Sequence, residues 1–439
     1  MSSFELGLLS VAAMLILIYA GMYVPVAITL VSFVSVWVLK GNVELAVRLL
    51  GLTASDTLQN YTFGVIPLFV VMGLLVSIAE LGRDAFDVAE QLFRRIKGGL
   101  GVTTVVANAI FAAITGISLA SAAIFTRVAV PEMLRHGYKP RFAVGVVAGS
   151  SVLGMLIPPS ILFIIFGLLT DTSVGHLFVA GVMPGILLAL AYSIGIMVMA
   201  RKWPSFVGGN VEPEAGRAQE DLLSVPEMLG KIAPIAILIL LVLGGIYDGI
   251  FTPTEAGAAG ALGALVIALL KRRLTWRQFW DVLMETGGVT AAISFLVIGA
   301  TLYSKMLALA GLPSELGTWL SSSGFGIYTF LAVYIAILLV LGTVVDSVSI
   351  MLIVLPLVLP TLEAMQVDLI WFGVITVIGV EIGLVTPPFG LVIFAIRSTL
   401  AEQEITLNDI FIGALPFAGI MLTVLAIVVA VPWLALGLL

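Results

Sequence analysis

Residues 150–160 read SSVLGMLIPPS, and residues 381–390 read EIGLVTPPFG. Both stretches lie in long apolar segments, and in both a pair of prolines follows a glycine by four positions. Each proline removes a backbone donor and clashes with the preceding turn, while glycine lets the chain unwind. The carbonyl groups released by such a break cannot face lipid, because an unsatisfied polar group there costs several kcal/mol. We therefore predict two broken helices that border a binding site, at Pro158, Pro159, Pro387 and Pro388; a plain proline kink is the alternative.

The two stretches belong to an internal repeat with an offset of about 229 residues. Gly154, Pro158 and Pro159 recur as Gly383, Pro387 and Pro388. The other matches keep the same order in both halves: Gly82 with Gly311, Ser118 with Ser347, Pro131 with Pro360, and, at offset 232, Gly181 with Gly413 and Pro184 with Pro416. We count five crossings in each half, and because five is odd, the second half begins on the opposite face of the membrane. Such inverted repeats are typical of secondary transporters, whose sites lie on broken helices at the repeat interface.

The composition is that of a protein that crosses a membrane many times. Of the 439 residues, 61% are hydrophobic and 10% are charged, and the mean hydropathy is +1.20. Soluble domains are about half apolar and a quarter charged, so a soluble enzyme is excluded. The 20 basic residues are outnumbered by 26 acidic ones, which excludes a nucleic-acid-binding protein. There is no cysteine and there are only two histidines, so a thiolate site is excluded and a histidine metal site is not expected.

Ten stretches approach the length of about 20 apolar residues that a membrane crossing needs. They are 5–20, 24–40, 62–82, 139–170 and 176–200 in the first half, and 231–248, 254–270, 288–310, 368–398 and 409–437 in the second. Two further apolar stretches, 99–135 and 326–362, have a polar interruption near the middle. Each could be two short crossings or one re-entrant hairpin, and we divide the chain on the hairpin interpretation.

The domain organisation follows from this division. The first inverted repeat covers 1–202, a polar cytoplasmic connector covers 203–230, and the second inverted repeat covers 231–439. Each repeat contains scaffold helices, a hairpin, a broken helix and a final helix: 5–82, 99–135, 139–170 and 176–200 in the first, and 231–310, 326–362, 368–398 and 409–437 in the second. Residues 48–56 and 274–285 are predicted to be amphipathic arms at the membrane interface. Residues 252–255 predict a capping box, with Pro253 at the first helical position.

The distribution of basic residues predicts the orientation. Only Lys40, Arg48 and Lys305 lie on one side of the traced chain, and the remaining 17 of the 20 Lys and Arg residues lie on the other. The positive-inside rule makes the richer side cytoplasmic and places both termini outside. Two full crossings in place of each hairpin would preserve this parity, so the charges predict the orientation and leave the hairpins open.

The middle of each hairpin stretch is rich in hydroxyl groups. Residues 115–121 read TGISLAS, and residues 342–349 read GTVVDSVS. Half-helix ends that meet there would present N–H groups to an anion and C=O groups to a cation. Ser and Thr also bond back to their own helix, and for Thr115 and Ser118 both interpretations stay open. For Asp346 we favour a cation ligand, since an acid deep in an apolar segment is costly; a structural hydrogen bond to another helix is the alternative.

Three further charged side chains lie in apolar segments. Glu381 could tune the site, carry a proton or pair with a buried base, and the sequence does not choose among these roles. Arg127 and Arg397 could be counter-charges for an anionic substrate. We favour the interpretation that both extend to the cytoplasmic face of the membrane.

The chain resembles the large membrane (M) subunit of tripartite ATP-independent periplasmic (TRAP) transporters. The resemblance is carried by five motifs in order: VPEMLRHGY at 130–138, GVVAGSSVLGMLIPPS at 145–160, GGIYDGIFTPTEAGA at 244–258, VVDSVSIMLIVLPLVLP at 344–360 and EIGLVTPPFGLVIFA at 381–395. It implies an elevator-type ion transporter in the bacterial cytoplasmic (inner) membrane, in which a transport domain with two hairpins slides against a scaffold. It also implies a small membrane subunit of the Q type, a periplasmic substrate-binding protein, and uptake of a small organic acid driven by Na⁺.

The resemblance implies two sodium sites. The first resembles Thr115, Gly116, Ser118, Ser151 and Gly154, and the second resembles Thr343, Asp346, Gly383 and Thr386. The family often has Ser-Gly-Ser-Ser at the first hairpin tip, whereas this chain has Thr-Gly-Ile-Ser. Ile117 therefore replaces a hydroxyl, and we expect this tip to contribute more backbone than side chain.

Three alternatives differ from this subunit in function. A self-sufficient Na⁺- or H⁺-coupled carboxylate symporter of related fold would need no binding protein. An intramembrane enzyme would need a nucleophile or a metal set at depth, which the absence of cysteine and the positions of the two histidines disfavour. A passive channel would not need repeated broken helices. We therefore expect a transporter and not an enzyme.

Overall fold

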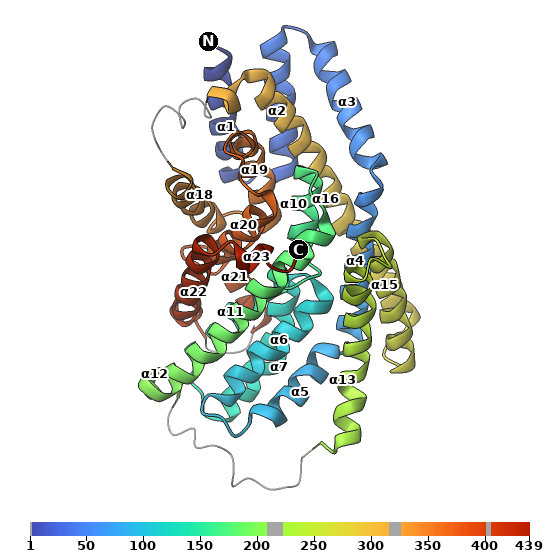
Figure 1. Cartoon of the computed structure of the whole chain (residues 1–439), viewed down its shortest axis with the longest axis vertical. Coiled ribbons are helices and arrows are strands. Elements are labelled where there is room, and N and C mark those ends of the chain that lie inside the picture. The colour runs from blue at the N-terminus through green and yellow to red at the C-terminus, as the bar shows by residue number, and fades with distance from the viewer. Residues whose placement is uncertain (1, 209–222, 316–325, 401–404) are drawn as a thin grey trace.

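The computed structural model describes all residues except 1, 209–222, 316–325 and 401–404 (Figure 1). The described chain is helical, and the only β-bridge within it joins Tyr138 and Gly208. Seven of its helices are long and apolar enough to cross a membrane, or up to eight if the bent pair Pro140–Leu156 and Ile161–Thr170 is one span. The predicted all-α polytopic membrane fold is therefore confirmed.

Not all ten predicted crossings reach this length. Helices α1 (Ser3–Tyr19) and α2 (Val24–Lys40) have 17 residues each and belong to the shorter apolar helices. A helix of this length spans about 25 Å, somewhat less than a hydrocarbon core of about 30 Å. A crossing by either helix therefore needs local thinning of the bilayer or flanking residues that extend to the interface.

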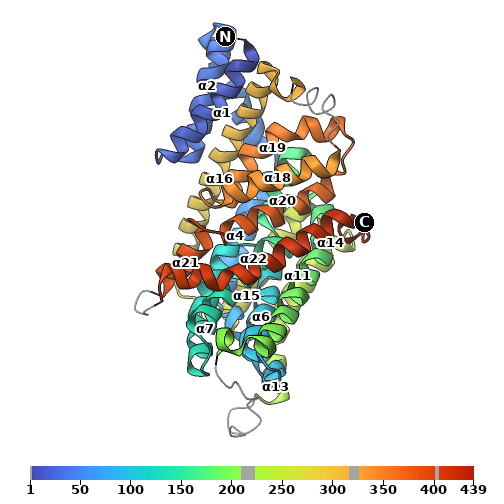
Figure 2. The ribbon, with the colours of Figure 1, turned by 90° about the vertical axis from the view of Figure 1, so that its left-hand side faces the viewer.

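One group of helices, which we call the outer helices, comes from the start of each half. In the first half they are α1, α2, α3 (Val43–Gln59), η1 (Tyr61–Gly64) and α4 (Val65–Ile78), and in the second half α13 (Val225–Ile239), η3 (Leu240–Gly244), α14 (Gly245–Tyr247), α15 (Pro253–Leu270) and α16 (Trp276–Ala310). Helix α2 packs on α16, and α4 packs on α15, so the two halves interlock. Helices α1 and α2 lie at one end of the long axis and α13 at the other (Figures 1 and 2).

Two boundaries in the second half differ from the sequence prediction. Helix α13 begins at Val225, before the predicted 231, because Ser224 and Glu227 form a capping box ahead of it. The connector is therefore shorter than 203–230; it contains the short helix α12 (Pro204–Val207), and its residues 209–222 lie outside the described residues. The predicted arm 274–285 and crossing 288–310 form the single helix α16, since no proline or cap interrupts them. The capping box predicted at Thr252 and Glu255 is confirmed.

Ion pairs join the outer helices of the second half to α5 (Leu81–Phe93), the helix that precedes the first hairpin. Lys231 on α13 pairs with Asp87, and Lys271, just after α15, pairs with Asp84. All four side chains are partly buried. The amphipathic α5 therefore links the two halves through ion pairs between residues that are far apart in the sequence.

The remaining helices, which we call the inner helices, form the two hairpin-and-break units. The first half provides α6 (Gly99–Thr115), α7 (Ser118–Arg135), α8 (Pro140–Ser151), α9 (Leu153–Leu156), α10 (Ile161–Thr170) and α11 (Val174–Lys202), and the second half provides α18 (Ile327–Gly342), α19 (Ser347–Ala364), α20 (Leu369–Leu384), α21 (Leu391–Thr399), α22 (Leu407–Ala430) and α23 (Trp433–Leu436). Helices α7 and α19 both have 18 residues and begin 229 positions apart. Every residue of α20 from Trp371 to Leu384 is buried, as expected of a helix that is apolar all round.

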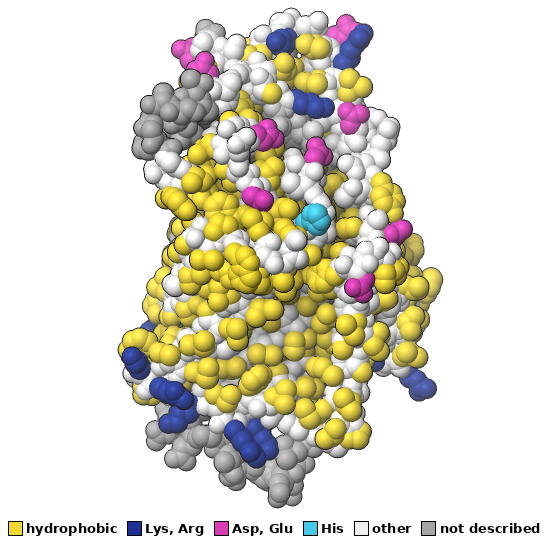
Figure 3. Space-filling model, in the orientation of Figure 1, with side chains coloured by type: hydrophobic (Ala, Val, Ile, Leu, Met, Phe, Trp, Pro, Cys, Tyr) yellow, Lys and Arg dark blue, Asp and Glu magenta, His cyan; other side chains and the backbone are white. Residues whose placement is uncertain are grey.

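The surface agrees with a membrane environment. Figure 3 shows apolar side chains over much of one face, and Lys and Arg side chains toward both ends, including the end near α12. Large exposed apolar residues include Trp37 on α2, Leu262 on α15 and Leu240 in η3. A soluble protein rarely exposes such continuous apolar surface.

Candidate ion and substrate site

The first hairpin turns at a glycine and touches the first break. Helix α6 ends at Thr115, Gly116 adopts a left-handed conformation with φ of 66°, and α7 begins at Ser118. A Cβ atom at Gly116 would lie 2.4 Å from the carbonyl oxygen of Pro159, so no other residue fits this approach. The carbonyl oxygen of Gly116 accepts a hydrogen bond of 3.4 Å from the amide of Ile161. The tip is therefore joined to the backbone that the prolines release.

The second hairpin meets the second break in the same way. Helix α18 ends at Gly342, and α19 begins at Ser347. The carbonyl oxygen of Thr343 accepts a hydrogen bond of 3.2 Å from the amide of Gly390, which lies 229 positions after Ile161. A Cβ at Gly383 would lie 2.6 Å from Gly342 Cα. We call α6–α10 the first unit and α18–α21 the second unit.

The glycine and prolines of each break have the same arrangement. A Cβ at Gly154 would lie 3.0 Å from the carbonyl carbon of Ile117, as Gly383 approaches Gly342 in the second unit. The Pro158–Pro159 and Pro387–Pro388 peptide bonds are both cis. The structure thus brings together Gly116, Ser118, Gly154 and Pro159 in the first unit, and Thr343, Gly383 and the backbone after Pro388 in the second.

Most of the candidate hydroxyl groups donate to their own helix. Thr115 donates to Phe111 O at 3.0 Å and Ser151 to Ala148 O at 2.9 Å, while Thr343 donates to Val340 O at 2.8 Å and Thr386 to Ile382 O at 2.5 Å. Back-bonding uses only the donor of each hydroxyl, so the oxygen lone pairs can still face a cation. In the described part of the chain, no three His, Asp or Glu side chains come together in a way that could hold a metal ion. The candidate set is therefore made mainly of hydroxyl and carbonyl oxygens, which hard cations accept as ligands.

Asp346 is the N-cap of α19. Its Oδ1 accepts a hydrogen bond of 3.0 Å from the backbone amide of Ser349, and its side chain is partly buried. The sequence predicts a cation ligand at Asp346, with a bond to another helix as the alternative, and neither interpretation includes this cap. An Asp before Ser-Val-Ser at the start of an apolar run is a capping signal that would have revealed it.

Glu381 on α20 lies beside the start of α19 and near the start of α7. Its side chain is 0% exposed, and its Oε1 accepts a hydrogen bond of 2.9 Å from Ser347 Oγ, at the first position of α19. Ser118, at the first position of α7, lies beside the same carboxyl group. Ser118 and Ser347 are equivalent positions of the repeat. Glu381 Oε2 and Ser118 Oγ are both buried without a hydrogen-bond partner.

A polar network that was not predicted from the sequence joins both helices of the first hairpin to α8. Asn108 Nδ2 donates to Ser150 Oγ on α8 at 2.6 Å, and Ser121 Oγ on α7 donates to Asn108 Oδ1 at 2.5 Å. All three side chains are 0% exposed. A lone Asn in the apolar segment 99–115 was the available signal, because a buried amide in a membrane helix needs partners on its neighbours.

The two candidate arginines lie beyond the first turn of α7 and of α21. Arg127 is exposed and lies nine positions beyond Ser118, about 13 Å along α7. Arg397 on α21 is partly buried, and its Nη1 has no hydrogen-bond partner. Neither forms an ion pair within the described part of the chain.

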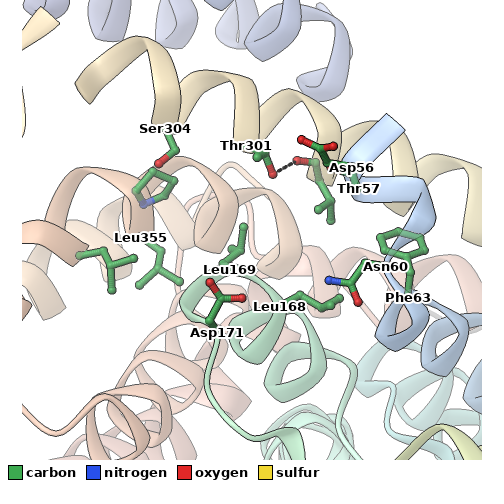
Figure 4. Close-up of a pocket in the computed structure, with 13 residues that line it drawn as sticks. Asp56, Thr57, Asn60, Phe63, Leu168, Leu169, Asp171, Thr301, Ser304 and Leu355 are labelled. Atoms are coloured by element: carbon green, nitrogen blue, oxygen red, sulfur yellow. Dashed lines mark hydrogen bonds between the residues drawn. The ribbon is translucent and has the colours of Figure 1, made fainter. Parts of the chain in front are cut away.

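Two clefts separate the units from the outer helices. One, of about 260 Å³, lies between α3, α10, α16 and α19 and is lined by Asp56, Asn60, Asp171 and Thr301 (Figure 4). The other, of about 450 Å³, lies between α4, α7 and α16 and is lined by Ser77, Arg127, Gln278, Asp281 and Glu285. Asp56 and Glu285 are 229 positions apart. The clefts thus occupy equivalent places on the outer side of the two hairpins.

Comparisons with known proteins show which family the sequence resembles. The sequence model of the family described as "Tripartite ATP-independent periplasmic transporter, DctM component" matches residues 11–434. The chain is 34% identical over 396 residues to the C4-dicarboxylate TRAP transporter large permease protein DctM of Pseudomonas aeruginosa, covering 90% of each chain. It is 30% identical over 417 residues to the sialic acid TRAP transporter large permease protein SiaM of Vibrio cholerae, covering 95% of this chain and 94% of the relative.

A third relative is longer than this chain. The isethionate TRAP transporter permease protein DctMQ of Oleidesulfovibrio alaskensis is 29% identical over 381 residues, which cover 86% of this chain and 58% of the relative. Among solved structures, the YdaH transporter of Alcanivorax borkumensis superposes with a TM-score of 0.60 at 14% identity, covering 89% of each chain. At this identity the structural likeness concerns the fold alone. The named relatives are permeases, which agrees with the expectation of a transporter.

Proposed function

Since the chain belongs to the DctM family of tripartite ATP-independent periplasmic transporters, we propose that it is the large transmembrane subunit of a Na⁺-driven uptake system for an organic acid. The observation that carries the proposal is that, in each unit, a hairpin tip contacts a proline break in the presence of buried oxygen atoms. In each unit a hairpin-tip carbonyl is bonded to the amide that follows the prolines. Broken helices that cross at the repeat interface are where secondary transporters bind substrate and ions.

Sodium is the coupling ion in this proposal. Thr115, Gly116, Ser118, Ser151 and Gly154 would hold one ion, and Thr343, Asp346, Gly383 and Thr386 another. The two sets supply hydroxyl and carbonyl oxygens and one carboxylate, which are the ligands that hard cations prefer. Ser118 Oγ, buried without a partner, supports the first site.

The substrate is an organic anion. Helices α7 and α19 both begin at the tips, and the N-terminus of a helix carries a partial positive charge of about half a unit. The relatives named above are transporters of C4-dicarboxylates, sialic acid and isethionate, all of which are anions. Arg127 lies about 13 Å along α7 from Ser118. The helix ends and the bound Na⁺ would therefore supply most of the positive charge, and Arg127 and Arg397 would tune affinity.

The outer helices are the proposed scaffold, and the two units are the proposed moving part. The clefts beside α7 and α19 lie between these groups and give space for sliding. A small membrane subunit of the Q type and a periplasmic binding protein would complete the system; the name of the DctMQ relative suggests the former. The excess of Lys and Arg on one side supports an inner-membrane location with both termini periplasmic.

Uptake in proteoliposomes tests the proposal. The chain is reconstituted with its small subunit, and uptake of radiolabelled organic acids is measured under an imposed Na⁺ gradient or an imposed pH gradient, with and without the binding protein. We expect uptake only with Na⁺ and the binding protein. Equal uptake driven by a pH gradient without Na⁺ would contradict sodium coupling, and sodium-driven uptake without the binding protein would favour a self-sufficient symporter.

A further inference from the structure

The side chain of Glu381 lies beside the first helical residue of both hairpins. Ser347 Oγ donates to its Oε1 at 2.9 Å, and Ser118 lies beside the same carboxyl group. Ser118 and Ser347 are related by the 229-residue repeat, but position 152, the counterpart of Glu381, is Val152. One half therefore supplies the single group on which two symmetric tips converge.

Burial of the Glu381 carboxyl group lowers the stability of the fold, which indicates that the group has a functional role. Glu381 is fully buried, its Oε2 has no partner, and none of the ion pairs in the described part of the chain involves it. A buried acid with an unsatisfied oxygen destabilises a fold, and an apolar residue of similar size would pack there at less cost. Tyr192 on α11, whose hydroxyl is also unpartnered, lies near the same group and does not neutralise it.

We infer that Glu381 is a positioning residue that couples the two hairpin tips, so that an ion bound at one tip raises the affinity for an ion at the other. The inference rests on the proposed sodium coupling. Ser118 belongs to the first proposed ion site, and Gly383 of the second follows Glu381 by two residues on α20. A shift of Ser118 upon ion binding therefore reaches Ser347 and its neighbour Asp346 through one carboxyl group. By linkage, the effect is the same in both directions.

The test uses single cysteines, which are easy to follow because the chain has none of its own. Leu119, 38% exposed beside the first tip, and Val344, 44% exposed at the second tip, are replaced one at a time by cysteine in the complex of both membrane subunits. The rate of maleimide labelling is then titrated with Na⁺. In the wild-type background we expect the labelling rates of both cysteines to change with Na⁺ and to share the same midpoint Na⁺ concentration. In Glu381→Leu we expect the two midpoints to separate by about five-fold or more.

Three further variants separate coupling from simple destabilisation. Glu381→Gln keeps groups that can hydrogen-bond to both serines and should restore the shared midpoint. Ser347→Ala, a smaller change, should separate the midpoints if Glu381→Leu fails to fold. Thr376→Val is the matched control: it removes a bond of 3.0 Å between α20 and Tyr334 on α18, away from the tips, and should leave the midpoint shared.

The outcomes are distinguishable. A shared midpoint in Glu381→Leu, or in Ser347→Ala where that variant replaces it, overturns the coupling inference while leaving sodium coupling intact. Separate midpoints in Glu381→Gln overturn it as well, because hydrogen bonding would then be insufficient. If neither cysteine responds to Na⁺ in the wild-type background, the proposed sodium coupling fails and the inference fails with it.

Discussion

The first and second units have the same order of helices and turns, but they differ in how deeply their proline breaks and candidate hydroxyl groups are buried. Pro158, Pro159 and Ser160 are buried, whereas their counterparts Pro387, Pro388 and Phe389 are exposed. Thr115 and Ser151 are buried in the first unit, and Thr343 and Thr386 are only partly buried in the second. The repeat therefore specifies the turns, and the side chains around them determine which unit is closed.

The Asn108 network explains much of this difference. Asn108, Ser121 and Ser150 join α6, α7 and α8 in the first unit. The equivalent positions in the second unit are Ile337, Ile350 and Gly379, which cannot form hydrogen bonds through their side chains. The second unit has one buried side-chain bond between α18 and α20, from Tyr334 to Thr376. We interpret the first unit as closed and the second unit as open in this conformation.

Replacing Asn108 should remove much of the difference between the units. Asn108→Leu leaves the buried Ser121 Oγ without its acceptor, and an unsatisfied buried group costs about 1–3 kcal/mol. We expect a lower thermal unfolding temperature in detergent and faster labelling of a cysteine placed at Ser160. Tyr334→Phe is the matched change in the second unit, with an expected cost of about 1 kcal/mol for one hydrogen bond. A larger loss for Tyr334→Phe than for Asn108→Leu would contradict our explanation of the closure.

The two hairpin tips also differ in helix capping. Asp346 caps α19, whereas its counterpart Ile117 does not cap α7. Asp346→Ala should lower stability by about 1 kcal/mol through loss of the cap, while Asp346→Asn should keep most of the cap. If Asp346 also binds Na⁺, Asp346→Asn should lose sodium-driven uptake at nearly wild-type stability. Unfolding temperatures and uptake measured on the same preparations separate the two roles. Wild-type sodium dependence in Asp346→Asn would show that the carboxylate only caps the helix.

The elements of the fold could be predicted from the sequence because they depend on local signals. The glycine and proline spacing predicts both breaks, and the hydroxyl-rich interruptions at 115–121 and 342–349 predict both turns. The continuity of α16 could not be predicted, since the polar arm and the apolar crossing read as separate segments. The early start of α13 had a local signal in Ser224 and Glu227, which the hydropathy of the segment concealed.

The contacts within the site could not be predicted from the spacing of residues in the sequence, because most of them join distant segments. The sequence identifies Glu381 and Ser118 as polar residues in apolar segments, but their meeting depends on the rotation of α20 relative to two hairpins. The Asn108 network likewise joins three helices across 42 positions of the chain. Asp346 differs, because its partner is local and the capping signal was present. Long-range polar contacts can therefore be identified only from the structure, whereas a helix cap can be predicted from the sequence.

The most direct test of this account compares one repeat position in the two units. Ser160→Cys and Phe389→Cys are 229 positions apart, and the native residues are 0% and 51% exposed. Each variant is reconstituted with the small subunit and treated with a membrane-impermeant maleimide applied to both sides. Because a buried thiol reacts only after local opening, we predict that Phe389→Cys reacts about ten-fold faster or more. Equal rates, or faster reaction of Ser160→Cys, would contradict the claim that the first unit is closed and the second is open.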